Sequence, residues 1–152
     1  MPHAIGTQPT VRPRASAPHH AAPQESSANQ VTDLTIATTT AEALRAAPGV
    51  VDISPGLFAL VATYGSGRRV AGIVVGHPTP EQIALETHVI LSEAYCNDLF
   101  AAAATDSPTR AQEGTSVLTA IADRIREAVY GGLRDATSLQ VARVDVYIDD
   151  LR

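Results

Sequence analysis

Two stretches of the chain place apolar residues three and four positions apart, which is the spacing of an amphipathic helix. The first begins near residue 31, ends at Pro48-Gly49, and has its apolar positions at Leu34, Ala37, Ala41 and Leu44. The second has the longest apolar stripe in the chain: Val117, Leu118, Ile121, Ala122, Ile125, Ala128, Val129 and Leu133. Near its end, Gly131-Gly132 predicts either fraying or close packing against a neighbour.

Five segments have the length and composition of β-strands and are bounded by turn residues. They are Val50–Ile53, Leu57–Tyr64, Val70–Val75, Ile83–Leu91 and Val141–Ile148. In the fourth, the odd positions from Ile83 to Leu91 share one face and the even positions share the other, which predicts a sheet covered on one side only. The order α-β-β-β-β-α-β predicts an α+β fold, with two helices packed on one face of a small, mostly antiparallel sheet of four to five strands. The final strand, helix and strand permit one parallel crossover.

The folded domain is expected at residues 31–152. Residues 1–30 hold half of the prolines and almost no branched aliphatic residues, so we expect a disordered tail that cannot bury enough apolar surface to fold. His3, His19 and His20 lie in this tail and lack the fixed geometry of a metal site. An insert at about 96–114 contains an Ala-rich apolar run, which predicts a short helix followed by a surface loop.

Composition narrows the possible functions. The chain has 16 acidic and 11 basic residues, and all of the basic residues are arginine. Residues 31–152 carry 15 acidic against 9 basic residues, a net charge of −6, which argues against a protein whose main task is to neutralise nucleic-acid phosphates. The single cysteine, Cys96, excludes an intrachain disulfide and a cysteine metal cluster. No apolar run approaches the length of a membrane span, and no signal peptide is evident; we expect a cytoplasmic protein.

The residues that carry chemistry form no complete catalytic motif. Glu86 and His88 share a strand face and are either the start of a metal or acid–base site or an ordinary solvated pair. Cys96 is either a nucleophile near His88 or a buried structural thiol. His77, beside two prolines, is interpreted as a loop residue. We therefore expect no enzyme activity, no catalytic residues, no metal site and no cofactor.

Positive charge is concentrated at one place, Gly65-Ser66-Gly67-Arg68-Arg69. A glycine-rich turn presents backbone N–H groups to an anion, and Arg68 and Arg69 beside it are suited to clamping a phosphate of a nucleotide, a nucleic acid or a lipid headgroup. The alternative is a plain hairpin turn whose arginines serve solubility. Arg68 and Arg69 are the candidate partner- or anion-binding residues.

The order of these segments resembles a known family. Gly49-Val50 after the first helix, Val61-Ala62-Thr63-Tyr64, the segment Gly67 to Ile73 (GRRVAGI) and Val89-Ile90-Leu91 are similar to the alkaline shock protein family, also called the Gls general-stress family. Ile121 to Arg126 with Val129, and Val141 to Asp149, resemble its second helix and terminal strand. The resemblance covers about residues 33–150 apart from the insert, and the Arg-only, Ala-rich composition looks like forms from high-GC actinobacteria.

Two departures from the family pattern concern the insert and the final strand. The family usually passes through Tyr-Gly directly into the second helix, whereas Tyr95 is followed here by Cys96 and the insert; Ser138-Leu139 stands where the family has a glycine.

The resemblance implies a non-enzymatic cytoplasmic protein of the cell-envelope or alkaline stress response. Such a protein self-associates as a homo-oligomer and gathers at the inner face of the membrane through protein–protein interaction with a small membrane anchor, without spanning the bilayer or binding nucleic acid. The alternative is a small nucleic-acid- or anion-binding module that uses the Gly65–Arg69 loop.

Overall fold

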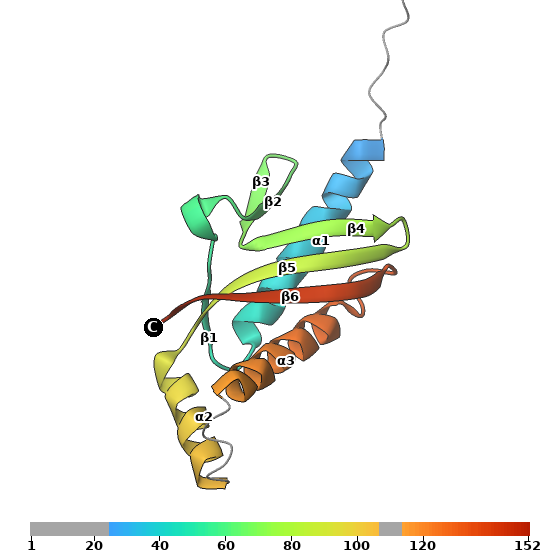
Figure 1. Ribbon diagram of the computed structural model, residues 1–152. Coiled ribbons are helices and arrows are strands. Elements are labelled where there is room, and N and C mark those ends of the chain that lie inside the picture. The colour runs from blue at the N-terminus through green and yellow to red at the C-terminus, as the bar shows by residue number, and fades with distance from the viewer. Residues whose placement is uncertain (1–24, 107–113) are drawn as a thin grey trace, which may run out of the picture.

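The computed structural model describes residues 25–106 and 114–152, and Figure 1 shows their arrangement. The helices are α1 (Glu25–Ala46), α2 (Glu93–Asp106) and α3 (Gly114–Leu133), with a single 3-10 turn, η1 (Leu57–Ala59). The strands are β1 (Val50–Ile53), β2 (Ala62–Gly65), β3 (Arg68–Ala71), β4 (Ile73–Thr79), β5 (Gln82–Leu91) and β6 (Gln140–Leu151). The expected α+β fold and element order are confirmed, with α2 as the helix expected at the insert and the third expected strand divided in two.

The main sheet is built around β5. On one edge of β5, β4 and β1 pair with it antiparallel, β4 along its first part and β1 at its end. On the other edge, β6 runs parallel to β5 over its whole length. The parallel pair follows the expected crossover, because α3 lies between β5 and β6 in the chain. A separate antiparallel hairpin, β2–β3, stands out from this sheet (Figure 1).

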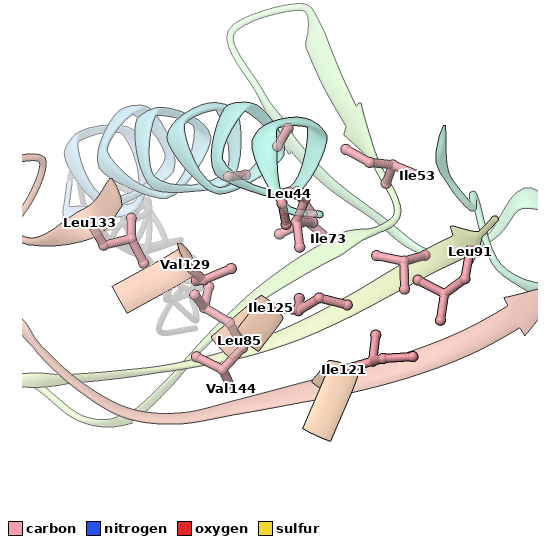
Figure 2. Close-up of a cluster of buried hydrophobic side chains, with 14 of the residues drawn as sticks. Leu44, Ile53, Ile73, Leu85, Leu91, Ile121, Ile125, Val129, Leu133 and Val144 are labelled. Atoms are coloured by element: carbon pink, nitrogen blue, oxygen red, sulfur yellow. The ribbon is translucent and has the colours of Figure 1, made fainter. Parts of the chain in front are cut away.

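Helices α1 and α3 cover one face of the main sheet, and the core lies between them and the strands. Figure 2 shows Leu44 of α1 and Ile125 of α3 meeting Ile73, Leu85 and other sheet residues. The residues at positions 83, 85, 87, 89 and 91 of β5 are all buried, whereas four of the five even positions are only half-buried. The predicted one-sided strand is therefore confirmed, and Thr87 satisfies its buried hydroxyl by donating to the Asp145 carbonyl at 2.9 Å.

Helix α1 is longer than the sequence predicts. It begins at Glu25, so residues 25–30 are helical and the boundary expected at residue 31 is wrong; residues 1–24 of the expected tail lie outside the described part of the chain. The expected stripe is buried, and Ile36 and Thr40 widen it. Thr40 donates to the Ile36 carbonyl at 2.8 Å, which lets a polar residue occupy a buried helical position.

Helix α3 carries the predicted stripe, with Ile121, Ile125, Val129 and Leu133 buried. Both Gly131 and Gly132 lie inside the helix. A Cβ on Gly132 would stand 3.0 Å from the Ala43 Cβ of α1, whereas one on Gly131 would meet nothing within 4 Å. Close packing against α1 therefore explains Gly132, and fraying is not needed.

Two expected strands are wrong in detail. The segment Leu57–Tyr64 begins with the exposed turn η1, and only its end belongs to β2. The segment Val70–Val75 is divided between β3 and β4 at Gly72, whose φ of 77° is left-handed. Gly72 donates its N–H to the Val61 carbonyl and accepts from the His88 N–H, both at 2.8 Å, so it turns the chain from the hairpin into the main sheet.

The insert begins with α2, as its apolar run predicts. Tyr95, Leu99 and Phe100 pack against the core, and the Tyr95 hydroxyl accepts a hydrogen bond from Arg124 of α3 at 3.1 Å. The loop expected to follow falls largely on residues 107–113, which lie outside the described residues.

Candidate functional site

The predicted basic segment forms the tip of the β2–β3 hairpin. Gly65 pairs with Arg68, so Ser66 and Gly67 make a two-residue turn, and their positive φ values of 47° and 72° suit the twist of a hairpin. Arg68 and Arg69 are both exposed. Within the described residues, the Arg68 side chain makes no hydrogen bond or ion pair, so its charge is free for a partner. A hollow of about 510 Å³ follows the hairpin from Tyr64 to Arg69.

An exposed apolar turn lies beside this hairpin, and the sequence does not predict it. We call Leu57, Phe58 and Leu60 the apolar turn; they are 77%, 81% and 75% exposed. Phe58 and Ala59 have left-handed φ values of 57° and 56°, which non-glycine residues rarely adopt. Three backbone bonds hold the turn, among them Val61 N–H to the Pro55 carbonyl at 3.1 Å.

Arg69 connects the apolar turn to the hairpin. Its Nη2 donates to the Ala59 carbonyl, and its guanidinium carbon lies 5.8 Å from the centre of the exposed Tyr64 ring, within the range of a cation–π contact. The turn and the hairpin are therefore joined into one surface, in which Arg69 contacts the apolar turn and Arg68 is its exposed neighbour beside the tip of the hairpin. We call this the turn–hairpin surface: Leu57, Phe58, Leu60, Tyr64, Arg68 and Arg69.

A second polar cluster surrounds His88 on the face of the sheet opposite α1 and α3. Its Nε2 lies 3.0 Å from Oε1 of Glu86, and its Nδ1 lies 3.0 Å from Oδ2 of Asp149. The same Oδ2 accepts from the Ser54 hydroxyl at 2.6 Å. The ring also stacks on Tyr147 with centroids 4.7 Å apart. The structure thus adds Asp149 to the Glu86–His88 pair predicted from the sequence. Asp149 lies on β6, and the alternation of residues along β5 does not reveal it.

The geometry of this cluster is more typical of a group that holds strands together than of a catalytic site. Both ring nitrogens of His88 face carboxylates, so neither is free to take a proton from a substrate or to bind a metal. Glu86 and Asp149 lie on opposite sides of the ring, and no group of three metal-binding side chains occurs among the described residues. Ser54 donates to Asp149 rather than to His88, which is not the arrangement that activates a serine nucleophile.

Cys96 and His77 also lie away from any shared site. Cys96 is buried in the core from α2, on the other side of the sheet from the His88 ring, so the structure does not bring the two together. Burial raises the pKa of its thiol, which disfavours the reactive thiolate. His77 belongs to β4 and not to a loop; its Nε2 lies 2.7 Å from Oδ1 of Asp33 in α1.

Comparison with models of protein families, with curated proteins and with solved structures finds no match to this chain. The function of this chain is therefore inferred from its sequence pattern, its fold and the side chains of its surface. Among the described residues, no helix is both long enough and apolar enough to cross a membrane.

Proposed function

We propose that this chain is a non-enzymatic, self-associating scaffold or interaction module that works close to the membrane in the response to envelope or alkaline stress. This is the role implied by the resemblance to the alkaline shock protein family. The observation that supports it best is the outer edge of β6. Within residues 25–106 and 114–152, β5 is the only strand that pairs with the 12-residue β6, so no strand covers its second edge, although Arg126 of α3 donates to the Val144 carbonyl at 3.0 Å.

The charges along β6 favour pairing with a second copy. Arg143 lies near the start of the strand, and Asp149 and Asp150 lie near its end. Antiparallel pairing of two β6 strands places Arg143 of each copy opposite the aspartates of the other. These contacts would add to the intrachain pairs that Arg143 makes with Asp145 at 2.7 Å and Asp150 makes with Arg152 at 3.0 Å, and opposite charges across strands stabilise a pair. A continuous sheet through two copies is then the basis of the homo-oligomer.

The His88 cluster supports a non-enzymatic role. His88 bonds to Glu86 through one ring nitrogen and to Asp149 through the other, so the titratable groups of this cluster are engaged with each other. The place of action in this proposal is the cytoplasm, at the inner face of the membrane, where a small membrane anchor protein is the partner.

Self-association is tested by measuring molar mass over a range of protein concentrations with analytical ultracentrifugation. We expect the wild type to form oligomers, Arg143→Asp to weaken them at least about tenfold, and Arg143→Asp with Asp150→Arg to restore them, because the double change restores opposite charges. Arg134→Asp, at an exposed position just after the end of α3, is the control for net charge. A wild type that stays monomeric at high concentration contradicts the scaffold.

The membrane anchor is tested by affinity capture of tagged protein from detergent-solubilised membranes. We expect a small membrane protein to co-purify in a fixed ratio. Failure to capture any membrane protein, together with a strictly monomeric wild type, would remove the proposal.

A second candidate is binding of nucleic acid through Arg68 and Arg69. The exposed Tyr64 ring beside Arg69 favours it, because bases stack on such rings. Retention on heparin or RNA that weakens with salt, and that Arg68→Ala with Arg69→Ala abolishes, would support this candidate. Elution at low salt would exclude it.

A further inference from the structure

The turn–hairpin surface combines a cluster of exposed apolar side chains with two exposed arginines. The apolar turn exposes three quarters or more of the side chains of Leu57, Phe58 and Leu60. Clustered exposed apolar side chains of this size mark sites of contact with a protein or a membrane. Two arginines lie beside them, in a domain whose net charge is negative.

Contacts within the protein fix the conformation of this surface. The apolar turn keeps Phe58 and Ala59 in the left-handed region, and a backbone strain of this kind persists only where the surrounding structure enforces it. The enforcing contacts are the backbone bonds of the turn and the bond from Arg69 to the Ala59 carbonyl. Arg69 therefore holds the apolar and the basic parts in one fixed arrangement.

We propose that the turn–hairpin surface binds directly to the surface of an anionic lipid bilayer. Phe58 and its two leucine neighbours enter the boundary between headgroups and acyl chains, and Arg68 and Arg69 contact the phosphates. Apolar side chains with adjacent basic residues are the pattern by which peripheral proteins attach to anionic membranes. The long arginine side chains reach the phosphates while their stems lie along apolar surface.

The surface fits a bilayer better than another protein chain. Its apolar side chains lie on a turn that stands out with the β2–β3 hairpin, at the end of the molecule away from α2 (Figure 1). A projecting turn inserts into a deformable lipid surface without a preformed groove. A second copy is an unsuitable occupant, because a two-fold contact would bring the positive charges of Arg68 and Arg69 of both copies together.

Two carboxylates that share a hollow with the apolar turn are already engaged with other side chains. Asp149 and Asp150 border a hollow that also includes Leu57. Asp149 already bonds to His88 and Ser54, and Asp150 lies 3.0 Å from Nε of Arg152. Arg68 has no such partner among the described residues, so the end of the hairpin remains positive.

This inference rests on the proposed function only in placing the protein at the membrane. Its test uses vesicles without protein, so it is separate from the capture of a membrane anchor in detergent. If a membrane anchor is captured but the protein does not bind vesicles, the proposed lipid contact is wrong and the scaffold proposal stands. If the protein binds vesicles but neither captures an anchor nor forms oligomers, the scaffold proposal is wrong and the lipid contact stands.

The first experiment is co-sedimentation of the full chain with vesicles of phosphatidylcholine that contain phosphatidylglycerol, and with vesicles of phosphatidylcholine alone. We expect binding to the anionic vesicles that weakens at high salt. Arg68→Ala with Arg69→Ala should lower the partition coefficient by about 30-fold, since each basic residue near an anionic surface strengthens binding about fivefold. Leu57→Ser with Phe58→Ser should lower it by at least about tenfold.

The matched control for charge is Arg134→Ala with Arg45→Ala, which removes the same charge from exposed positions elsewhere. We expect this control to bind like the wild type within about twofold. Three results would overturn the proposal: no binding of the wild type to anionic vesicles, an equal loss in the control, or unchanged binding after Leu57→Ser with Phe58→Ser.

A second measurement reports insertion directly. The chain contains no tryptophan, so Phe58→Trp introduces a single tryptophan at the centre of the apolar turn. We expect its emission to shift to shorter wavelength when anionic vesicles are added, because the ring leaves water. Tyr130→Trp, at an exposed position on α3, should show no shift; the same shift at both positions, or none at Phe58, contradicts insertion by the apolar turn.

Discussion

The carboxylate of Asp149 lies 3.0 Å from Nδ1 of His88 and so joins β6 to β5 through side chains as well as through the backbone. Its Oδ2 also accepts the hydroxyl of Ser54, which follows β1. One carboxylate thus connects three strand segments that are far apart in the chain.

Asp149→Ala should lower the free energy of unfolding by about 1–3 kcal/mol, because it leaves the buried Ser54 hydroxyl and a ring nitrogen of His88 without an acceptor. The control is Glu86→Ala, whose side chain is 42% exposed and whose loss should cost about 1 kcal/mol or less. Urea denaturation measures both. Equal losses would show that Asp149 has no special structural role.

Gly72→Ala should be the most damaging glycine substitution in the hairpin region. A Cβ at this position would lie 2.3 Å from the Ser54 carbonyl oxygen and 2.4 Å from Cγ2 of Ile53, and φ is left-handed. We expect a loss of more than about 3 kcal/mol, since overpacking alone costs about 1–3 kcal/mol and the backbone conformation adds about 1–2.

Gly67→Ala is the control for Gly72→Ala. It has a similar φ of 72° but nothing within 4 Å of its Cβ, so only the conformational cost of about 1–2 kcal/mol applies. Thermal unfolding followed by circular dichroism ranks the two variants. A Gly67→Ala variant as unstable as Gly72→Ala would contradict the packing explanation.

Gly131 and Gly132 give a second matched pair. Gly131→Ala should raise the free energy of unfolding by about 0.4–1 kcal/mol, because alanine restricts the unfolded chain and fits the helix. Gly132→Ala should gain less or lose stability, because its Cβ would press on Ala43 at 3.0 Å. The same gain in both variants would show that α1 and α3 do not need the glycine at their contact.

Cys96 should make stability depend on pH in the alkaline range. Burial raises the pKa of its thiol above the ordinary value of 9.0, so the unfolded chain releases the proton at lower pH than the folded chain. The free energy of unfolding therefore falls as pH rises from the unfolded pKa through the folded pKa. We expect a steeper alkaline fall in the wild type than in Cys96→Ala, measured by urea denaturation at several pH values; parallel slopes would contradict this.

Periodic segments with one buried face could be predicted from the sequence. The alternation of buried and half-buried residues in β5, and the apolar stripe of α3, each extend over many residues. One unfavourable residue, such as Gly132 in α3, therefore does not obscure the pattern. Their burial follows from the pattern itself, because only one face of each element carries enough apolar residues to cover the core.

The apolar turn and the division at Gly72 could not be predicted in the same way. A short apolar run such as Leu57 to Ala62 has the composition of a buried strand, yet its first residues project into solvent. Gly72 stands inside a run of branched residues, and only the nearby Ser54 carbonyl reveals why that position must be glycine. In both places contacts between distant segments decide the conformation, and a local pattern does not contain them.

The pairing of β5 with β6 also governs the order in which the chain assembles. Thr87 and Asp145 are 58 residues apart, whereas β4 and β5 are joined by a short turn and pair at once. Closing the longer loop costs more chain entropy and comes later. We therefore expect that, until α3 docks and delivers β6, the partly folded chain exposes one edge of β5 and its row of Ile83, Leu85 and Val89, and that aggregation competes with folding at this stage.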